Sequence, residues 1–321
     1  IMRGVWLMLW GFVKKIVIAD RIGAFTKEIF GHTFDYHGGI FLAVGIAYSI
    51  QIYCDFSGCM DIVRGTSECF GIVLGENFRR PYFSQTLPEF WRRWHLSLGA
   101  FFREYVFYPV STSKLFLKLN VKIRDHLGNV IGKVFAASIP ILCVWVLTGL
   151  WHGAKWNYIA WGLYHGVLIC MSTLFEEPLA KLTKALRIKT DCISWEIFRM
   201  LRTFILCVIG RLIFMGQGIR SSIWMIRSMV FDHSRVYNIV DEFSLSGREW
   251  RVLIFGCLLL LAVSIAQEIM ERRGSTGDVR EWLAKQNIVF KWLVMAAGLA
   301  FIAICGVYGS GAGASFIYEQ F

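Results

Sequence analysis

The feature that most constrains this chain is a series of long segments without a charged side chain. Lys133 and Lys155 bracket one such segment, and another runs from Trp156 to Phe175. A helix needs roughly 20 mostly apolar residues to cross the hydrocarbon core of a bilayer, and both segments meet that length. Because 56% of the 321 residues are hydrophobic and only 18% are charged, the composition does not suit a soluble globule. We therefore predict an all-α, polytopic transmembrane bundle.

Six segments are predicted to span the membrane as helices. They lie at about 36–54, 134–152, 156–175, 203–219, 252–268 and 292–310. Two shorter apolar runs, Gly4–Phe12 and Ile16–Ala19, flank the basic residues Lys14 and Lys15, and we expect them to form an interfacial or re-entrant piece. Because the chain starts at Ile1 rather than Met, we expect it to be a fragment that lacks upstream spans.

The formal net charge of +11 indicates which partners to expect. Lysines and arginines fall mainly between and beside the apolar segments, whereas a nucleic-acid-binding protein gathers them on one soluble face. Nucleic acid is therefore not an expected partner, and the anionic headgroups of the lipid bilayer are. The basic connections 111–133 and 176–202 are predicted to face the cytoplasm, which places the C-terminus on the other side.

Familiar catalytic and metal-binding motifs do not occur. The nine cysteines form no CxxC or Cys/His pattern, so no metal site is expected. GxSxG, HExxH and phosphate-loop motifs are also missing from the sequence. Asp55 and Asp61 could bind the coupling ion of a transporter, but we favour a polar cluster at a helix end.

The segment 79–110 differs in kind from the apolar spans. It mixes arginines with many aromatic residues and cannot cross lipid unaided. Thr86 and Glu89 form a capping-box pattern with Pro88 in the first turn, which predicts that a helix starts there. At helical spacing, one face of this helix would carry Trp91, His95, Leu98 and Phe102.

Two histidines stand out as candidates for chemistry. His152 ends an expected span, where an ionisable group is costly enough to suggest a function, and Gly149 and Gly153 flank it. A histidine that bonds to backbone near the aqueous end of a span is an equally open interpretation. For His95 an interfacial or structural role is favoured, and for His165 a role in packing.

Arg211 is a third unusual residue, because it lies inside the expected span 203–219. An arginine facing lipid would cost about 2.5–3.5 kcal/mol, so it should face a protein cavity or extend to the interface. A cavity that attracts phosphate or a thioester carrier is one interpretation. Pairing with a buried acid is the other, and the sequence leaves both open.

Several short motifs occur in a fixed order along the chain. They include Lys14–Asp20, Gln51–Gly58, Glu76–Phe78, Pro81–Tyr82, Glu89–Leu98, Phe102–Tyr105 and Thr148–Ala154. In these motifs the chain resembles the bacterial membrane-bound O-acyltransferases, in the alginate O-acetyltransferase branch. The resemblance implies a single membrane domain over 1–321 with a central tunnel, in the bacterial cytoplasmic (inner) membrane. It further implies that an acetyl group from cytoplasmic acetyl-CoA, a substrate rather than a bound cofactor, is moved across for O-acetylation of an extracytoplasmic polysaccharide.

The resemblance also assigns residues. His152 matches the catalytic histidine of the family, and His95 matches its second histidine. An imidazole with a pKa near about 6.5 can take the proton of an attacking hydroxyl at neutral pH. The residues expected to line the tunnel or contact substrate are Trp91, Arg93, Trp94, Trp151 and Arg211.

The C-terminal residues Phe316–Phe321 are similar to the family's terminal FIYFQF. The tyrosine of that motif, which Tyr318 matches, is proposed to pass the acyl group to an extracytoplasmic partner of the SGNH-hydrolase type. Residues 309–321 are therefore predicted to form an extracytoplasmic tail, although an interfacial aromatic anchor is also possible. Glu319 replaces an aromatic residue of the motif.

Two other functions stay open at this point. D-alanyl transferases of teichoic acid, which resemble the chain, take their acyl group from a carrier protein and place such a tail on a separate small protein. A tail within this chain therefore favours acetyl transfer over D-alanyl transfer. A transporter or scaffold without enzymatic activity is the alternative from another class.

Overall fold

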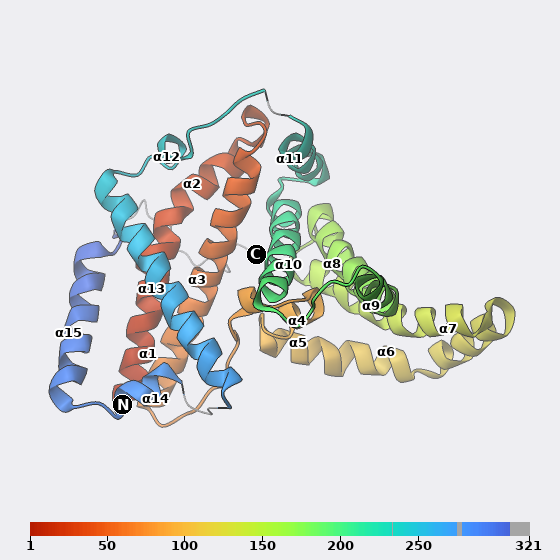
Figure 1. The fold of residues 1–321 in the computed structure, drawn as a ribbon, viewed down its shortest axis with the longest axis horizontal. Coiled ribbons are helices and arrows are strands. Elements are labelled where there is room, and N and C mark those ends of the chain that lie inside the picture. Colours follow the sequence, from red (N-terminus) through yellow and green to blue (C-terminus); the bar gives the residue numbers. More distant parts are fainter. Residues whose placement is uncertain (233, 275–277, 309–321) are drawn as a thin grey trace. The chain divides into compact units, whose positions relative to one another are not determined.

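The computed structural model describes residues 1–232, 234–274 and 278–308. In this part of the chain the regular structure is helical, with one isolated bridge between Phe78 and Trp94, so the predicted all-α class is confirmed (Figure 1). Residues 309–321, which hold the predicted tail and Tyr318, lie outside the described residues.

The chain forms two compact units. One comprises Ile1–Glu76 and Arg227–Phe321, and the other comprises Asn77–Ile226. The single functional domain predicted over 1–321 stays a prediction.

The first unit begins with one uninterrupted helical path. It comprises α1 (Met2–Phe12), the π-helix η1 (Val13–Ala19) and α2 (Asp20–Gly31). Right-handed helical angles at Val13 and Asp20, where one segment passes into the next, keep the path continuous. The re-entrant turn that was one expectation for this region is therefore wrong.

Small residues explain why this path packs along α3 (Ile40–Cys69). A Cβ atom on Gly4 would lie 2.3 Å from the carbonyl oxygen of Gly65, and one on Gly11 would lie 2.6 Å from that of Gly58. The two backbones therefore touch at two levels, as is typical of helix pairs inside membranes. Neither level leaves space for a side chain.

The predicted polar cluster at Asp55 and Asp61 lies inside α3 rather than at its end, because α3 continues to Cys69. Lys14 Nζ donates to Asp61 Oδ2 at 2.6 Å, and Lys15 Nζ bonds to both Asp55 and Asp20. These side chains are at most 15% exposed. A lysine buried among helices keeps its charge only when it is paired, so the acids have a structural role.

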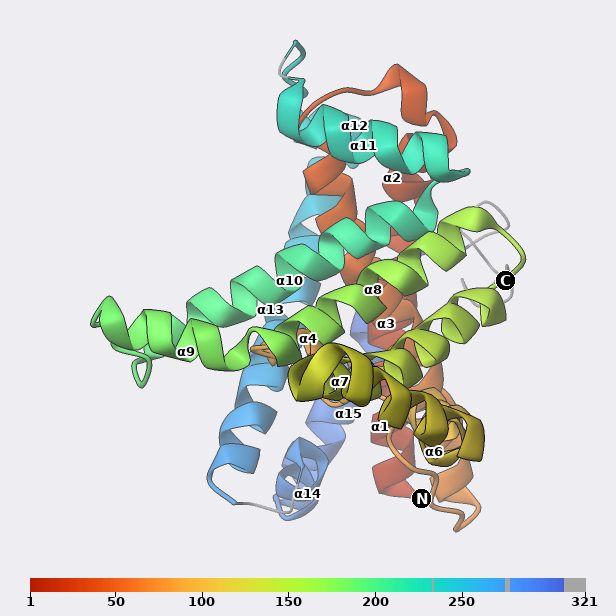
Figure 2. The same ribbon diagram turned by 90° about the vertical axis from the view of Figure 1, so that its right-hand side faces the viewer.

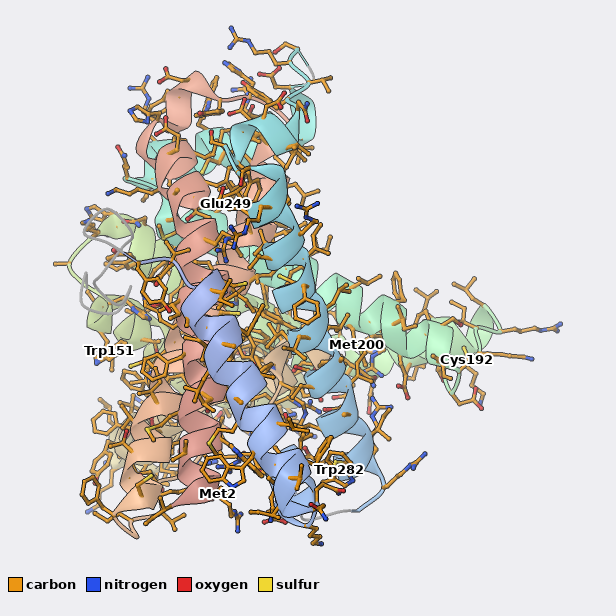
Figure 3. The ribbon with its side chains drawn as sticks, turned by 90° about the vertical axis from the view of Figure 1, so that its left-hand side faces the viewer. Met2, Trp151, Cys192, Met200, Glu249 and Trp282 are labelled. Atoms are coloured by element: carbon orange, nitrogen blue, oxygen red, sulfur yellow. The ribbon has the colours of Figure 1, made fainter. Side chains whose placement is uncertain are left out.

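The carboxyl-terminal helices of the first unit pack on the same path (Figure 3). Those that contact the path are α13 (Gly247–Arg272), α14 (Val279–Ala284) and α15 (Ile288–Cys305), and the short helix α12 (Ile239–Glu242) precedes them. A capping box of Ser246 and Glu249 starts α13. Val307 N donates to Ile16 O at 2.9 Å, and Arg3 pairs with Glu281 at 2.9 Å.

The second unit contains a long helical hairpin and a third helix beside it (Figure 2). Its elements are η3 (Pro81–Phe83), α4 (Leu87–Trp91), α5 (Leu96–Phe102), η4 (Arg103–Phe107), α6 (Tyr108–Thr112), α7 (Lys114–Trp151), α8 (Trp156–Leu174), α9 (Glu176–Ala185), α10 (Ile193–Met215) and most of α11 (Ile219–Phe231). Gly128, with φ of 87°, bends the chain within α7. A Cβ atom on Gly162 would lie 2.2 Å from Trp145 O, so α7 and α8 are in backbone contact.

By length and composition, four described helices can cross a membrane. They are Ile40–Cys69, Ile131–Trp151, Gly247–Arg272 and Ile288–Cys305. A fifth span results if α8 and α9, which are bent by 56°, count as one. The chain is thus a multi-pass membrane protein, and its described helices supply four or five of the six predicted spans. The helix expected at 203–219 forms as α10, but it also includes the charged residues Glu196, Arg199, Arg202 and Arg211.

Candidate active site

His152 lies at the turn that joins α7 to α8 within the second unit. Its backbone N–H donates to Gly149 O at 3.2 Å, and Gly153 follows with φ of 133°, which an L-residue rarely adopts. A Cβ atom on Gly149 would lie 2.4 Å from Tyr158 O. The tight turn that these glycines permit leaves His152 only 8% exposed.

Aromatic rings surround the His152 imidazole. Its centroid lies 4.8 Å from that of Trp151, 5.2 Å from that of Trp161 and 4.9 Å from that of Phe214. Asn157 Nδ2 donates to the carbonyl oxygen of Phe214 at 2.7 Å and so ties the start of α8 to the end of α10. The imidazole therefore sits among rings whose positions are fixed by three helices.

The helix predicted to start at Thr86 and to carry His95 on one face is broken in two. Its start is as predicted, because Thr86 Oγ1 accepts a hydrogen bond from Glu89 N at 3.2 Å. However, α4 ends at Trp91 and α5 begins only at Leu96. The expected shared face is therefore wrong.

The break follows from backbone pairing with a distant segment. Phe78 and Trp94 form an antiparallel bridge, and Arg79 N donates to Arg93 O at 2.9 Å. Backbone groups used in this way cannot join a helical ladder. His95 then adopts φ of 49°, a left-handed conformation that directs its side chain differently from a helical residue.

Asn77 influences which nitrogen of His95 carries the proton. The Asn77 Oδ1 atom accepts from Ser97 N at 3.0 Å, which identifies it as the amide oxygen. The same oxygen lies 3.3 Å from His95 Nδ1. Ser97 Oγ donates to the same oxygen at 2.9 Å and lies 3.4 Å from Nδ1. Since an amide oxygen only accepts hydrogen bonds, the contact with Asn77 favours the tautomer with the proton on Nδ1, in which Nε2 is the basic nitrogen.

Trp151 contacts both candidate histidines. Its ring centroid lies 6.1 Å from that of His95 and 4.8 Å from that of His152. The two imidazoles come from separate segments of the second unit and converge on this one indole. The structure thus brings together the two histidines that the sequence singled out.

Trp91 and His165 belong to an adjoining aromatic cluster. The Trp91 ring lies 4.9 Å from His165 and 4.7 Å from Trp145, measured between centroids. His165 is 2% exposed, which agrees with the packing role expected for it. Trp91 and Trp161 each bury an indole Nε1 that has no hydrogen-bond partner in the described part of the chain.

The two arginines expected at the site behave differently. Arg93 pairs with Glu89 at 2.8 Å, one helical turn away. Arg211 is 4% exposed, and its guanidinium carbon lies 4.6 Å from the ring centroid of Trp94. Among the residues that the structure describes, no carboxylate forms an ion pair with Arg211, so the acid of the second interpretation is not found in this part of the chain.

Three residues of the site were not among the sequence-predicted ones. Asn77, Trp161 and Phe214 contact the histidines through folding of distant segments. Asn77 lies in the motif Glu76–Phe78, so the motif could have indicated that this residue belongs to the site. The motif did not indicate that Asn77 contacts His95. Trp161 and Phe214 look like ordinary residues of apolar helices.

Both histidines are neutral at pH 7. Burial lowers the pKa of His95, which lies outside the candidate spans, to about 4. The pKa of His152, which follows the last residue of the span Ile131–Trp151, is also lowered, first by burial and then by the charge of Arg211. A neutral imidazole can accept a proton, as a general base must.

Comparison with known proteins adds a family to this geometry. The model of the MBOAT, membrane-bound O-acyltransferase family, matches residues 5–123. A probable alginate O-acetylase AlgI of Pseudomonas syringae is 30% identical over 275 residues, 86% of this chain and 48% of that protein. A peptidoglycan O-acetyltransferase of Helicobacter pylori is 28% identical, over 71% of this chain and 38% of that protein. A teichoic acid D-alanyltransferase of Bacillus subtilis is 29% identical, over 54% of this chain and 42% of that protein.

The chain spans about half the length of the alginate O-acetylases it matches. The family model covers the turn that holds His95, and the similarity to the Pseudomonas syringae protein extends over most of the chain. The predicted family is confirmed: the chain belongs to the membrane-bound O-acyltransferases.

Proposed function

We propose that the protein is an O-acyltransferase that moves an acetyl group from cytoplasmic acetyl-CoA for O-acetylation of an extracytoplasmic polysaccharide. The observation that carries this proposal is the convergence of two neutral histidines, His95 and His152, on Trp151. A buried neutral imidazole is suited to accept the proton of a hydroxyl, and apolar walls keep competing water away.

In the proposed reaction His152 acts as general base. It takes the proton of the acceptor hydroxyl while the hydroxyl oxygen attacks the thioester carbonyl carbon. A C–O bond forms, the C–S bond breaks, and the thiolate leaves with the proton that His152 held. The acceptor hydroxyl carries one proton, which goes to His152, so His95 supports the site through its contact with Trp151, the ring that also contacts His152.

The acyl group and the acceptor are inferred from the names of the relatives. An alginate O-acetylase and a peptidoglycan O-acetyltransferase are both acetyl-transferring enzymes by name. We infer the same transfer here, in the bacterial cytoplasmic (inner) membrane, with an SGNH-hydrolase-type partner outside it. The alternative is D-alanyl transfer to teichoic acid from a carrier protein, which the Bacillus subtilis relative supports over a shorter part of the chain.

The test uses membranes that contain the protein, radiolabelled acetyl-CoA and the native envelope polymer. We expect label in the polymer with the wild type and none with His152→Ala. His126→Ala is the matched control, because His126 is exposed, lies before the bend at Gly128 and, within the described residues, bonds to the backbone of its own helix at Lys122 O. Undiminished labelling by folded His152→Ala would show that His152 is not the general base. Transfer from a D-alanyl carrier protein, with none from acetyl-CoA, would favour D-alanyl transfer.

Tyr318 is proposed to relay the acetyl group to the external partner. If so, label should appear on the protein itself after brief exposure to acetyl-CoA and should be absent from Tyr318→Phe. Loss of polymer acetylation in that variant with wild-type label still on the protein would place the relay at another residue.

A further inference from the structure

Arg211 is a buried charge that the reaction described above does not use. Its side chain is 4% exposed, and Nε and Nη2 have no hydrogen-bond acceptor within residues 1–232, 234–274 and 278–308. A guanidinium carries only donors, and burying donors without partners is strongly unfavourable. A ligand that supplies acceptor atoms would remove this cost.

The helix α10 places Arg211 beside both candidate histidines. Phe214, one turn further along the same face, contacts the His152 ring at a centroid distance of 4.9 Å. The guanidinium itself lies over the ring of Trp94, the residue directly before His95. The charge of Arg211 also acts on the imidazole of His152. All of these residues belong to the second unit.

The contact with Trp94 holds the cation without using its donors. A cation over an aromatic face is attracted by the ring electrons, but this contact forms no N–H···O hydrogen bond. The exposed fraction of only 4% also contradicts a side chain that extends to the membrane surface. Arg211 is thus fixed in place with two N–H groups directed at an acceptor that the described residues do not provide.

We propose that Arg211 is a catalytic residue that binds the carbonyl oxygen of the acyl group and stabilises the negative charge that develops on it. This rests on the proposed function. As the hydroxyl oxygen attacks, the carbonyl π electrons move onto the oxygen, and the Nε–H and Nη2–H groups donate to its lone pairs. When the C–S bond breaks, the carbonyl re-forms and Arg211 keeps its proton, while His152 passes the hydroxyl proton to the departing thiolate.

The place of Arg211 favours a carbonyl oxygen over a fixed phosphate. Its two N–H donors could hold either group, but the guanidinium lies over Trp94, directly before His95, and its charge acts on His152, where the reacting carbonyl must bind. A pre-positioned donor in a dry site is also worth most where charge appears only during the reaction. The ligand of Arg211 is therefore an oxygen whose charge is transient.

The first measurement is steady-state acetyl transfer by Arg211→Gln, Arg211→Lys and wild type. We expect Arg211→Gln to lower kcat on the order of 100-fold with a much smaller change in KM for acetyl-CoA, as loss of a transition-state donor does. Arg211→Lys should recover only part of the rate, because a lysine presents a point charge and not the planar pair of donors. Arg202→Gln is the matched control on the same helix, since Arg202 is exposed and bonds to Gln85 O.

The second measurement is binding of two unreactive analogues to the folded protein in detergent. S-carboxymethyl-CoA carries a negative carboxylate near the position of the thioester carbonyl, and S-ethyl-CoA carries a neutral group there. Wild type and His152→Ala should prefer the carboxymethyl analogue, and Arg211→Gln should lose that preference while it still binds S-ethyl-CoA.

The outcomes separate this inference from the function on which it rests. Equal weakening of both analogues in Arg211→Gln would mean that Arg211 binds the CoA phosphates, and it would overturn the inference alone. Unchanged kcat in Arg211→Gln would do the same. If the wild type bound neither analogue, both the CoA donor and the role of Arg211 toward it would be overturned.

Discussion

The amide oxygen of Asn77 accepts a hydrogen bond from the backbone N–H of Ser97 and lies 3.3 Å from His95 Nδ1. One side chain thus holds the start of α5 and favours one tautomer of a site histidine. Beside metal-bound histidines, replacing the residue that hydrogen-bonds to the second ring nitrogen commonly lowers metal affinity or activity 10–100-fold.

Replacing Asn77 tests this role. Asn77→Ala should lower kcat by roughly 10-fold or more, because Nδ1 and Nε2 then compete for the proton. Asn77→Asp keeps the acceptor and adds a negative charge, which favours the charged imidazole and raises the pKa of His95. The acidic limb of the pH profile of kcat should therefore move to higher pH in Asn77→Asp. An unchanged profile in both folded variants would show that Asn77 only supports the chain.

Burial of neutral His95 also predicts how stability depends on pH. Its pKa is about 4 in the folded chain, below the unfolded value of 6.5, so the unfolded state binds the proton first as the pH falls. Stability should be constant above about pH 6.5 and decrease toward pH 4, by at most about 3 kcal/mol from this residue. Thermal unfolding between pH 7 and pH 4 should be flatter for His95→Gln than for wild type. If the melting temperatures of the two proteins fell in parallel with pH, the lowered pKa of His95 would be contradicted.

The contact between α7 and α8 predicts a steric effect. In Gly162→Ala the new Cβ atom would lie 2.2 Å from Trp145 O, so the helices must separate, at a cost of about 1–3 kcal/mol. The melting temperature in detergent should fall accordingly. Gly31→Ala is the control, since a Cβ atom there meets nothing within 4 Å. Equal melting temperatures for the two variants would mean that the helices are not in backbone contact.

The buried ion pairs of the first unit predict an asymmetric response to substitution. Lys15→Met leaves the carboxylates of Asp55 and Asp20 without their lysine and should destabilise the protein by roughly 3–5 kcal/mol. Adding Asp55→Asn to that variant removes one uncompensated charge and should recover part of the loss. If the double variant were less stable than the single one, the role of Lys15 in neutralising Asp55 would be wrong.

Local sequence patterns predicted the parts of the fold that depend on local chemistry. The apolar run before Trp151 predicted a span, and Thr86 predicted the start of α4, because hydropathy and capping act over a few residues. His95 and His152 were also found, since polar residues beside apolar spans are conspicuous. The break between α4 and α5 could not be foreseen, because it depends on backbone pairing between Trp94 and the distant residue Phe78.

The same limit explains the error near the start of the chain. Lys14 and Lys15 look like a basic pair at the membrane surface when only their neighbours are considered. Their partners Asp61 and Asp55 lie 40 or more residues away in sequence, so only the folded chain shows that both lysines are buried. Likewise, nothing near Arg211 in sequence indicates whether an acid reaches it.

The wide turn of the π-helix Val13–Ala19 has a consequence for how this chain tolerates change in length. Adjacent side chains of an α-helix diverge by about 100°, yet Lys14 and Lys15 both reach acids of α3. A π turn holds about one residue more than an α turn, so a single-residue deletion in this segment would restore the α-helical ladder and leave the flanking helices nearly in phase. Gly4 and Gly11 would then keep their contacts with α3, whereas the pairing of Lys14 and Lys15 with their acids would change. A deletion within α1 itself has no wide turn to absorb it and would rotate the residues before it by about 100°.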